Sequence, residues 1–208
     1  QLSIAAAALA VNVLAARVMG PSGRGQIALV LQISYVLAVL ALAGTDRAYP
    51  AVMPGANAAG MRQLAAPGIA IATAGCATTS LVLHSRPQLA VLAGLLALIT
   101  AGNAMLTGLR AADATAGTRT YLPAALTGQA VLVAAAAVLT ATGTSSPTAW
   151  AFAYALSLTI PAGVLWVRTW HQPDHDPRPA RKLGWKLLPG TIAGIIAMRA
   201  DRIMLPAL

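Results

Sequence analysis

Glutamate is absent from this chain of 208 residues, so its five acidic residues are all aspartates. Charged residues make up 9% of the sequence, whereas an ordinary soluble domain carries about 25%. One cysteine is present, Cys76, and it lies inside an apolar run. These scarcities exclude an internal disulfide and a paired-thiol metal site, leave few candidates for acid chemistry, and argue against a soluble globule.

Apolar sequence is what the chain has in abundance. Hydrophobic residues make up 58% of it, and the mean hydropathy is +0.71. A helix needs about 20 mostly apolar residues to cross a bilayer, because its backbone polar groups must be bonded within the helix. Seven segments meet or approach this length, at residues 2–19, 26–44, 64–83, 88–109, 121–141, 150–167 and 187–208. The sequence predicts an all-α integral membrane protein.

Two polar breaks separate the first three segments. Residues 20–25 read Gly-Pro-Ser-Gly-Arg-Gly, which indicates a tight turn between helices. Their glycine spacing is that of a phosphate-binding loop, but Gln26 and Ile27 stand where Lys and Ser or Thr are needed, so we reject nucleotide binding. The second break begins at Thr45-Asp46-Arg47, and a connector that contains Pro, Gly and Asn extends from it through Arg62.

The positions of Lys and Arg indicate an orientation. The net charge of +9 alone would suit a nucleic-acid partner, but such a protein clusters its cations on a solvated face, and here they lie singly between apolar runs. Positive residues are retained on the cytoplasmic side of a membrane. With the N-terminus inside, nine Lys and Arg fall in cytoplasmic loops and three outside. We expect a multi-pass protein of the inner (cytoplasmic) membrane with a cytoplasmic N-terminus and no nucleic-acid partner.

The seventh segment carries charges inside apolar sequence. Arg199 and Arg202 are spaced i, i+3 on one helical face, with Asp201 between them. A charge within a bilayer costs about 2.5 to 3.5 kcal/mol on insertion scales, so the group needs a partner or an aqueous cavity. A role in a polar cavity and simple anchoring at an interface both stay open.

Catalytic and metal-binding patterns are weak. His171, Asp174, His175 and Asp176 are competent metal ligands, but they lie in a Pro-rich loop, and we expect no metal site there. Ser and Thr are scattered through apolar helices with no His in reach by sequence spacing. We therefore expect no enzyme and no cofactor.

Residues 16–29 carry a family resemblance. The stretch Ala16-Arg17-Val18-Met19-Gly20-Pro21-Ser22-Gly23-Arg24-Gly25 resembles the first hairpin of polysaccharide-biosynthesis and lipopolysaccharide flippases, whose pattern is Ala-Arg-x-Leu-Gly-Pro-x-Gly-Arg-Gly. Met19 replaces the usual Leu. Gly108-Leu109-Arg110 and Arg199-Ala200-Asp201-Arg202 also agree with that family, so the resemblance extends over essentially the whole chain.

The resemblance implies the multidrug/oligosaccharidyl-lipid/polysaccharide exporter superfamily, in which two six-helix lobes surround a central cavity. Residues 1–168 would form the first lobe, residues 169–186 a basic cytoplasmic linker, and residues 187–208 the first helix of a second lobe. Because the chain starts at Gln1 inside an apolar run, we expect further sequence before it. Such proteins move a polyprenyl-pyrophosphate-linked glycan to the outer leaflet by alternating access.

A cationic cavity suits this function, because Arg binds pyrophosphate in a bidentate manner while the lipid tail stays in the bilayer. The predicted substrate-binding residues are Arg17, Arg47, Arg199 and Arg202, with Asp46 and Asp201 as orienting or ion-coupling partners. For Arg17 and Arg47, anchoring at a helix end is an equally open interpretation.

Three alternatives remain at this point. A cation-coupled multidrug exporter would have the same fold. A membrane-embedded glycosyltransferase or ligase would need a large outer loop with paired acids, and the outside loops here are short and acid-free. A non-transporting scaffold would bind glycan-assembly proteins through residues 171–186. In every case membrane lipid surrounds the chain.

Overall fold

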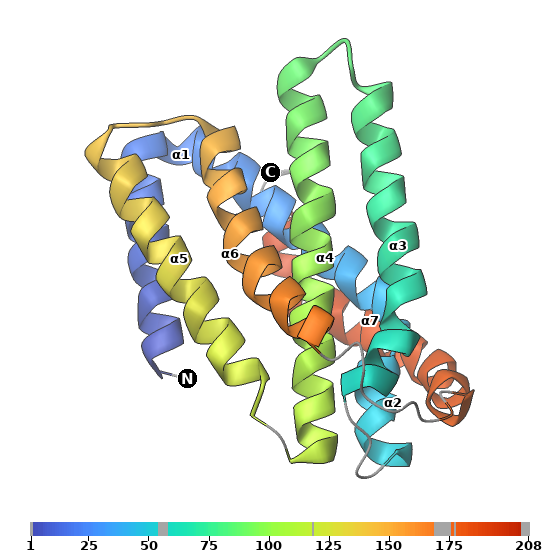
Figure 1. Cartoon of the computed structure of the whole chain (residues 1–208). Helices are drawn as coiled ribbons and strands as arrows, with labels where there is room; N and C mark the ends of the chain where they lie inside the picture. Colours follow the sequence, from blue (N-terminus) through green and yellow to red (C-terminus); the bar gives the residue numbers. More distant parts are fainter. Residues whose placement is uncertain (1, 54–57, 118, 169–175, 177, 205–208) are drawn as a thin grey trace.

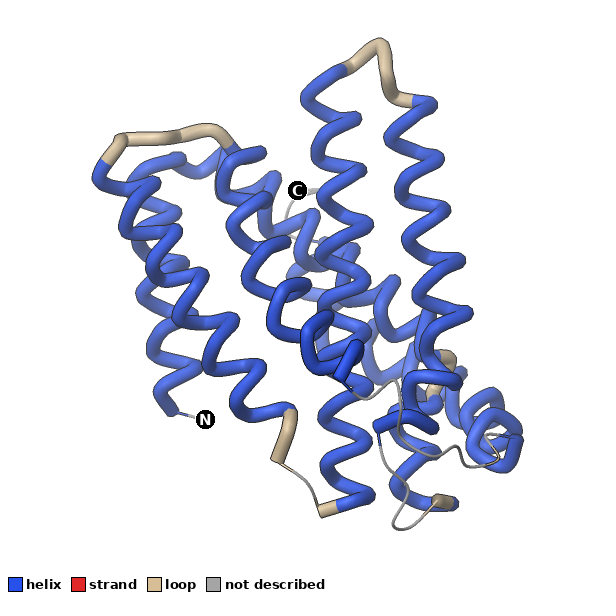
Figure 2. The backbone as a smooth tube through the Cα atoms, in the orientation of Figure 1, coloured by secondary structure: helices blue, strands red, loops and turns tan. Residues whose placement is uncertain are grey.

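The chain folds as a bundle of α-helices in a computed structural model. The structure describes residues 2–53, 58–117, 119–168, 176 and 178–204, apart from the side chains of residues 2–5, 196 and 198–204. Its helices are α1 (Leu2–Leu42), α2 (Thr45–Val52), α3 (Ala58–Val82), α4 (Pro87–Ala116), α5 (Tyr121–Ala141), α6 (Pro147–Arg168) and α7 (Arg178–Met204). The described residues contain no strand, which confirms the all-α prediction (Figures 1 and 2).

Within the described residues, five helices are long and apolar enough to cross a membrane, namely α1, α3, α4, α5 and α6. They contain six of the seven predicted segments, because α1 includes the first two. The seventh segment belongs to α7, which is not among the five. The helices therefore have the length and composition of a multi-pass membrane protein.

Helix α1 consists of two helices joined at Gly20. Gly20 has φ 70° and ψ −177°, a backbone region that is essentially restricted to glycine. Pro21 then begins the second half, where its missing N–H costs little. A Cβ at Gly23 would lie 2.9 Å from the Cβ of Met19, so the bend also needs a small residue there. The predicted turn exists, but only Gly20 leaves the helical conformation.

The bend makes α1 cross the bundle twice. In Figure 1 the chain rises from the N-terminus, turns at the top and descends obliquely to α2. The α3–α4 and α5–α6 connections lie at the same upper end as the bend, whereas α2 and the α4–α5 connection lie at the lower end with the N-terminus. The connections therefore alternate between two ends, as a multi-pass topology requires.

The predicted connector over residues 45–62 contains helix α2 and the first turn of α3. Gly44 is left-handed, with φ 72°, and it redirects the chain after α1. Asp46 then lies in the first turn of α2, where a carboxylate interacts favourably with the positive end of the helix dipole. Tyr49 is fully buried and packs in one cluster with Leu42 and Met61. An acid in the first turn and one buried aromatic residue thus support a short helix in sequence that looks like a break.

Helix α7 begins at Arg178, within the segment predicted to be a basic linker. Ala180 is fully buried, and a Cβ at Gly184 would lie 2.9 Å from the carbonyl oxygen of Ala43 and 3.0 Å from the amide nitrogen of Thr45. The first turns of α7 therefore pack against the α1–α2 junction. The division into two lobes stays a prediction.

Glycines bring the central helices close together. A Cβ at Gly102 on α4 would lie 2.7 Å from the Cβ of Leu158 on α6. A Cβ at Gly128 on α5 would overlap the carbonyl oxygen of Ser157, also on α6. Small residues allow such close contact in membrane bundles, where dispersion forces and not water drive helix association. These two contacts hold α4 and α5 to α6.

Candidate functional site

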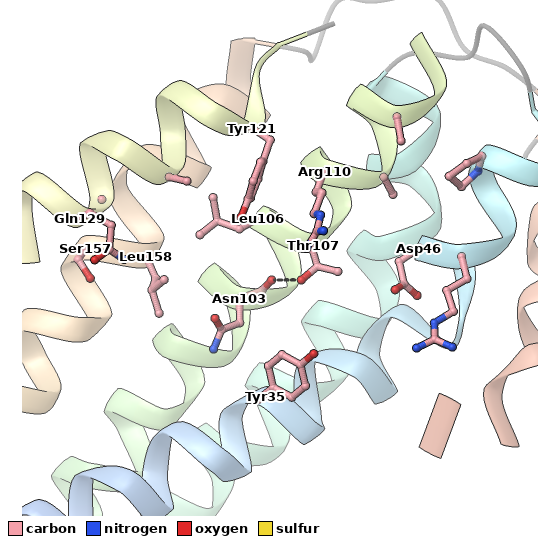
Figure 3. A pocket seen from close by; sticks show the side chains of 16 residues that line it. Tyr35, Asp46, Asn103, Leu106, Thr107, Arg110, Tyr121, Gln129, Ser157 and Leu158 are labelled. Atoms are coloured by element: carbon pink, nitrogen blue, oxygen red, sulfur yellow. Dashed lines mark hydrogen bonds between the residues drawn. The ribbon is translucent and has the colours of Figure 1, made fainter. Parts of the chain in front are cut away.

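A cavity of about 550 Å³ lies between α1, α2, α4, α5 and α6 (Figure 3). Its polar lining side chains are Tyr35, Asp46, Arg47, Asn103, Thr107, Arg110, Tyr121, Gln129 and Ser157. We call it the polar cavity. Its volume is typical of small-molecule sites. Polar side chains among membrane-spanning helices are costly, so their concentration here marks it as the candidate functional site.

Two cations and one acid define the charge of this lining. Arg47 and Arg110 are both exposed, whereas Asp46 is half-buried. Oδ1 of Asp46 is buried without a hydrogen-bond partner among the described residues. Burial raises the pKa of Asp46 above its ordinary value of 3.8, against smaller lowering effects from the backbone N–H groups of Asp46 and Arg47 and from the charge of Arg47. The two arginines outnumber the single acid, so the lining carries a net positive charge.

Two amide side chains add neutral polar groups. The Nδ2 of Asn103 donates to Oγ of Ser34 at 3.1 Å, and Ser34 donates to the carbonyl oxygen of Leu31 at 2.7 Å, which holds Asn103 against α1. Oε1 of Gln129 is buried and has no partner among the described residues. Buried acceptors in folded proteins are normally satisfied by protein, water, ion or ligand. Gln129 and Asp46 are therefore acceptors suited to a ligand that carries hydroxyl donors.

Asp113 fixes the end of the cavity where α4 meets α5. Its carboxyl oxygens accept hydrogen bonds from Oγ1 of Thr120 at 2.5 Å and from the backbone nitrogen of Tyr121 at 2.6 Å. Gly117 ends α4 in the left-handed conformation, with φ 66°, and so allows the chain to turn. The start of α5 is thereby tied to α4, and Tyr121 is held in the cavity lining.

The structure brings together only some of the predicted site residues. Asp46 and Arg47 line the polar cavity. Arg17 is exposed on the first half of α1 and is not among the lining residues. Arg199, Asp201 and Arg202 belong to α7, but their side chains lie outside the described part of the chain, so their roles stay predictions.

Sequence reasoning missed Arg110, Asn103 and Gln129 as site residues. The sequence places Arg110 just after the end of a span, although α4 continues to Ala116. Asn103 and Gln129 are lone amides inside long apolar segments, and an amide in a spanning helix usually faces a cavity or another helix. That cost of burial is the signal that could have identified both.

No protein-family model, curated protein or solved structure matches this chain. The resemblance to polysaccharide flippases therefore rests on its sequence motifs, and the function is stated below as a proposal.

Proposed function

We propose that this chain is the first lobe, with the opening helix of a second lobe, of a membrane transporter that flips a polyprenyl-pyrophosphate-linked glycan. The observation that carries the proposal is the polar cavity, which Arg47 and Arg110 line between α1, α2, α4, α5 and α6; all of these except α2 are apolar enough to span a bilayer. No covalent step is needed, because the substrate only changes leaflet.

The lining chemistry suits the parts of such a substrate. Each guanidinium can donate two hydrogen bonds to a phosphate, and these bonds strengthen in a low dielectric. The unpartnered oxygens of Asp46 and Gln129 can accept hydrogen bonds from sugar hydroxyl groups. The isoprenoid tail would remain in the bilayer beside the apolar helix exteriors. Anionic and hydroxyl-rich chemistry is therefore favoured over a purely apolar cargo.

Charge distribution suggests the side from which substrate loads. Arg47 belongs to α2, and Arg110 lies near the last turns of α4, at the end of the bundle where the N-terminus is drawn in Figure 1. Under the rule that positive residues stay in the cytoplasm, the end that carries most Lys and Arg faces inward. We infer that the polar cavity accepts its substrate from the cytoplasmic leaflet.

A cation-coupled drug exporter is the second candidate, and Asp46 favours it. A half-buried carboxyl with a raised pKa and an unpartnered oxygen can take up and release a proton during a transport cycle. The same cavity would fit a cationic drug poorly, since two arginines share the lining. The two candidates therefore differ in their cargo and not in the fold.

Neutralising both cavity arginines tests the proposal. We expect the Arg47→Gln/Arg110→Gln variant of the full-length protein to lose export of surface glycan at least tenfold, because a hydrogen bond to a charged group contributes about 1.5–3 kcal/mol. Arg86→Gln is the matched control, since Arg86 is exposed in the α3–α4 turn and lies outside the cavity lining. All variants should reach the membrane in equal amounts.

Normal glycan export by the double variant would refute the assignment. Unchanged glycan export with increased drug sensitivity would favour the drug exporter. Arg199→Ala, measured in the same assay, separately tests the predicted role of α7.

A further inference from the structure

A second hollow lies on the outside of the bundle, between the end of α1, the start of α3 and the first turns of α7. It encloses about 440 Å³ and shares no lining residue with the polar cavity. Its walls are mainly apolar and include Leu37, Leu40, Leu64 and Ile71. We call it the apolar groove.

Small residues create the apolar groove. A Cβ at Gly68 would overlap the carbonyl oxygen of Ala41, so α3 and α1 touch at their backbones there. Ala72 on α3 and Ala43 at the end of α1 leave further space beside that contact. The rim remains open, since Ile71 is 74% exposed and Leu40 is 43% exposed. In a bilayer the apolar groove would face the acyl chains.

The part of the apolar groove that α7 lines is basic and aromatic. Arg181 and Trp185 on α7 both line it, and their i, i+4 spacing places them on the same helix face. Trp185 is 61% exposed, as is usual for a tryptophan at a membrane interface. No acidic residue is among the described residues that line the groove. A positively charged side chain therefore lies beside an apolar groove, and this arrangement complements the negative headgroup and apolar chains of an anionic lipid.

We propose that the apolar groove binds one anionic phospholipid of the bilayer, with its phosphate at Arg181 and an acyl chain along Leu40 and Ile71. The proposal does not rest on the transport function. It does connect to the candidate site, because Thr45 lines the groove while the next two residues, Asp46 and Arg47, line the polar cavity. A bound lipid would contact the α1–α2 junction that positions both side chains.

The fluorescence of Trp185 can report lipid binding in the apolar groove. The full-length protein is reconstituted in phosphatidylcholine with increasing fractions of dibrominated phosphatidylglycerol or dibrominated phosphatidylcholine, whose bromine atoms quench nearby tryptophan fluorescence. The difference between wild type and Trp185→Phe isolates the signal of this site. We expect phosphatidylglycerol to be preferred about fivefold, the gain expected from one cation beside an anionic lipid.

Two variants separate a binding site from diffuse attraction. Arg181→Gln should abolish the preference, whereas Lys182→Gln should retain it, because Lys182 is exposed and lies outside the groove lining. Both remove one positive charge from the same helix turn. Ala72→Leu fills the groove without adding a fluorophore, and it should reduce quenching of Trp185 by both brominated lipids.

Three results would overturn the proposal. Equal quenching by the two lipids in the wild type would show that no anionic lipid is selected. Equal losses in Arg181→Gln and Lys182→Gln would show only general surface attraction. Absence of quenching at Trp185 by either lipid would show that protein, from this chain or a second copy, covers the groove.

Discussion

Replacing Gly20 by alanine tests the bend that makes α1 cross the bundle twice. Gly20 has φ 70° and ψ −177°, and a residue with a Cβ held in such a region costs about 1–3 kcal/mol. Space does not limit the substitution, because a Cβ at this position meets nothing within 4 Å. The loss should come from backbone strain alone. In a chain of this size it should lower the unfolding temperature by roughly 2–12 °C.

Gly25→Ala is the matched control for this substitution. A Cβ added at Gly25 also meets nothing within 4 Å, but this residue is helical, so alanine should stabilise the protein by about 0.5–1 kcal/mol. Thermal unfolding of the purified full-length protein in one detergent compares the two variants. Opposite shifts are expected. A neutral Gly20→Ala variant, or equal shifts for both, would refute the bend as the structure has it.

Three further predictions concern the polar cavity and its supports. Because burial raises the pKa of Asp46, the stability that its neutral form gives is present at low pH and lost as the pH rises through that raised value. Asp46→Asn should therefore gain stability over wild type with rising pH, and a pH-independent difference in unfolding temperature would contradict this. Asp113→Ala should lower the free energy of unfolding by roughly 1–3 kcal/mol, because it breaks two hydrogen bonds to the start of α5. The control Asp176→Ala, at an exposed site, should change it by less than about 0.5 kcal/mol. Equal changes in denaturant titrations would refute the role of Asp113 in holding α5 to α4. Gln129→Leu removes a buried acceptor that has no partner among the described residues, so it should lower glycan export without lowering the free energy of unfolding. A destabilised variant would show that Oε1 is bonded in the folded protein.

The apolar helices were predictable because backbone polar groups in lipid must be bonded within a helix, which requires uninterrupted apolar runs long enough to cross the bilayer. Helix α5 spans Tyr121–Ala141, as predicted, since polar residues bound that run on both sides. Gly20 and Pro21 were equally informative, because both restrict the backbone through their own covalent structure. Such local effects need no knowledge of the rest of the chain.

The remaining features depend on contacts between distant residues. Helix α2 forms where Tyr49 packs in one cluster with Met61 and Leu109, and these partners lie outside the eight residues of the helix. The polar cavity joins side chains from five helices, with Asp46 and Gln129 far apart in sequence. Two of its residues were predicted from a family resemblance, whereas the lone amides required an estimate of which helix face is buried. Helix-to-helix packing decides that face.

The bend motif and the polar cavity carry different kinds of information. Gly20, Pro21 and Gly23 each have a backbone or packing reason to be where they are, so the pattern that resembles the flippases explains how α1 folds back. A resemblance in one hairpin bears on architecture, and one architecture can serve several functions. Arg47 and Arg110 are exposed side chains that line the polar cavity, where they are accessible to a ligand. Variants of these two arginines therefore test the proposed transport function, whereas variants of the bend test only whether the bundle forms.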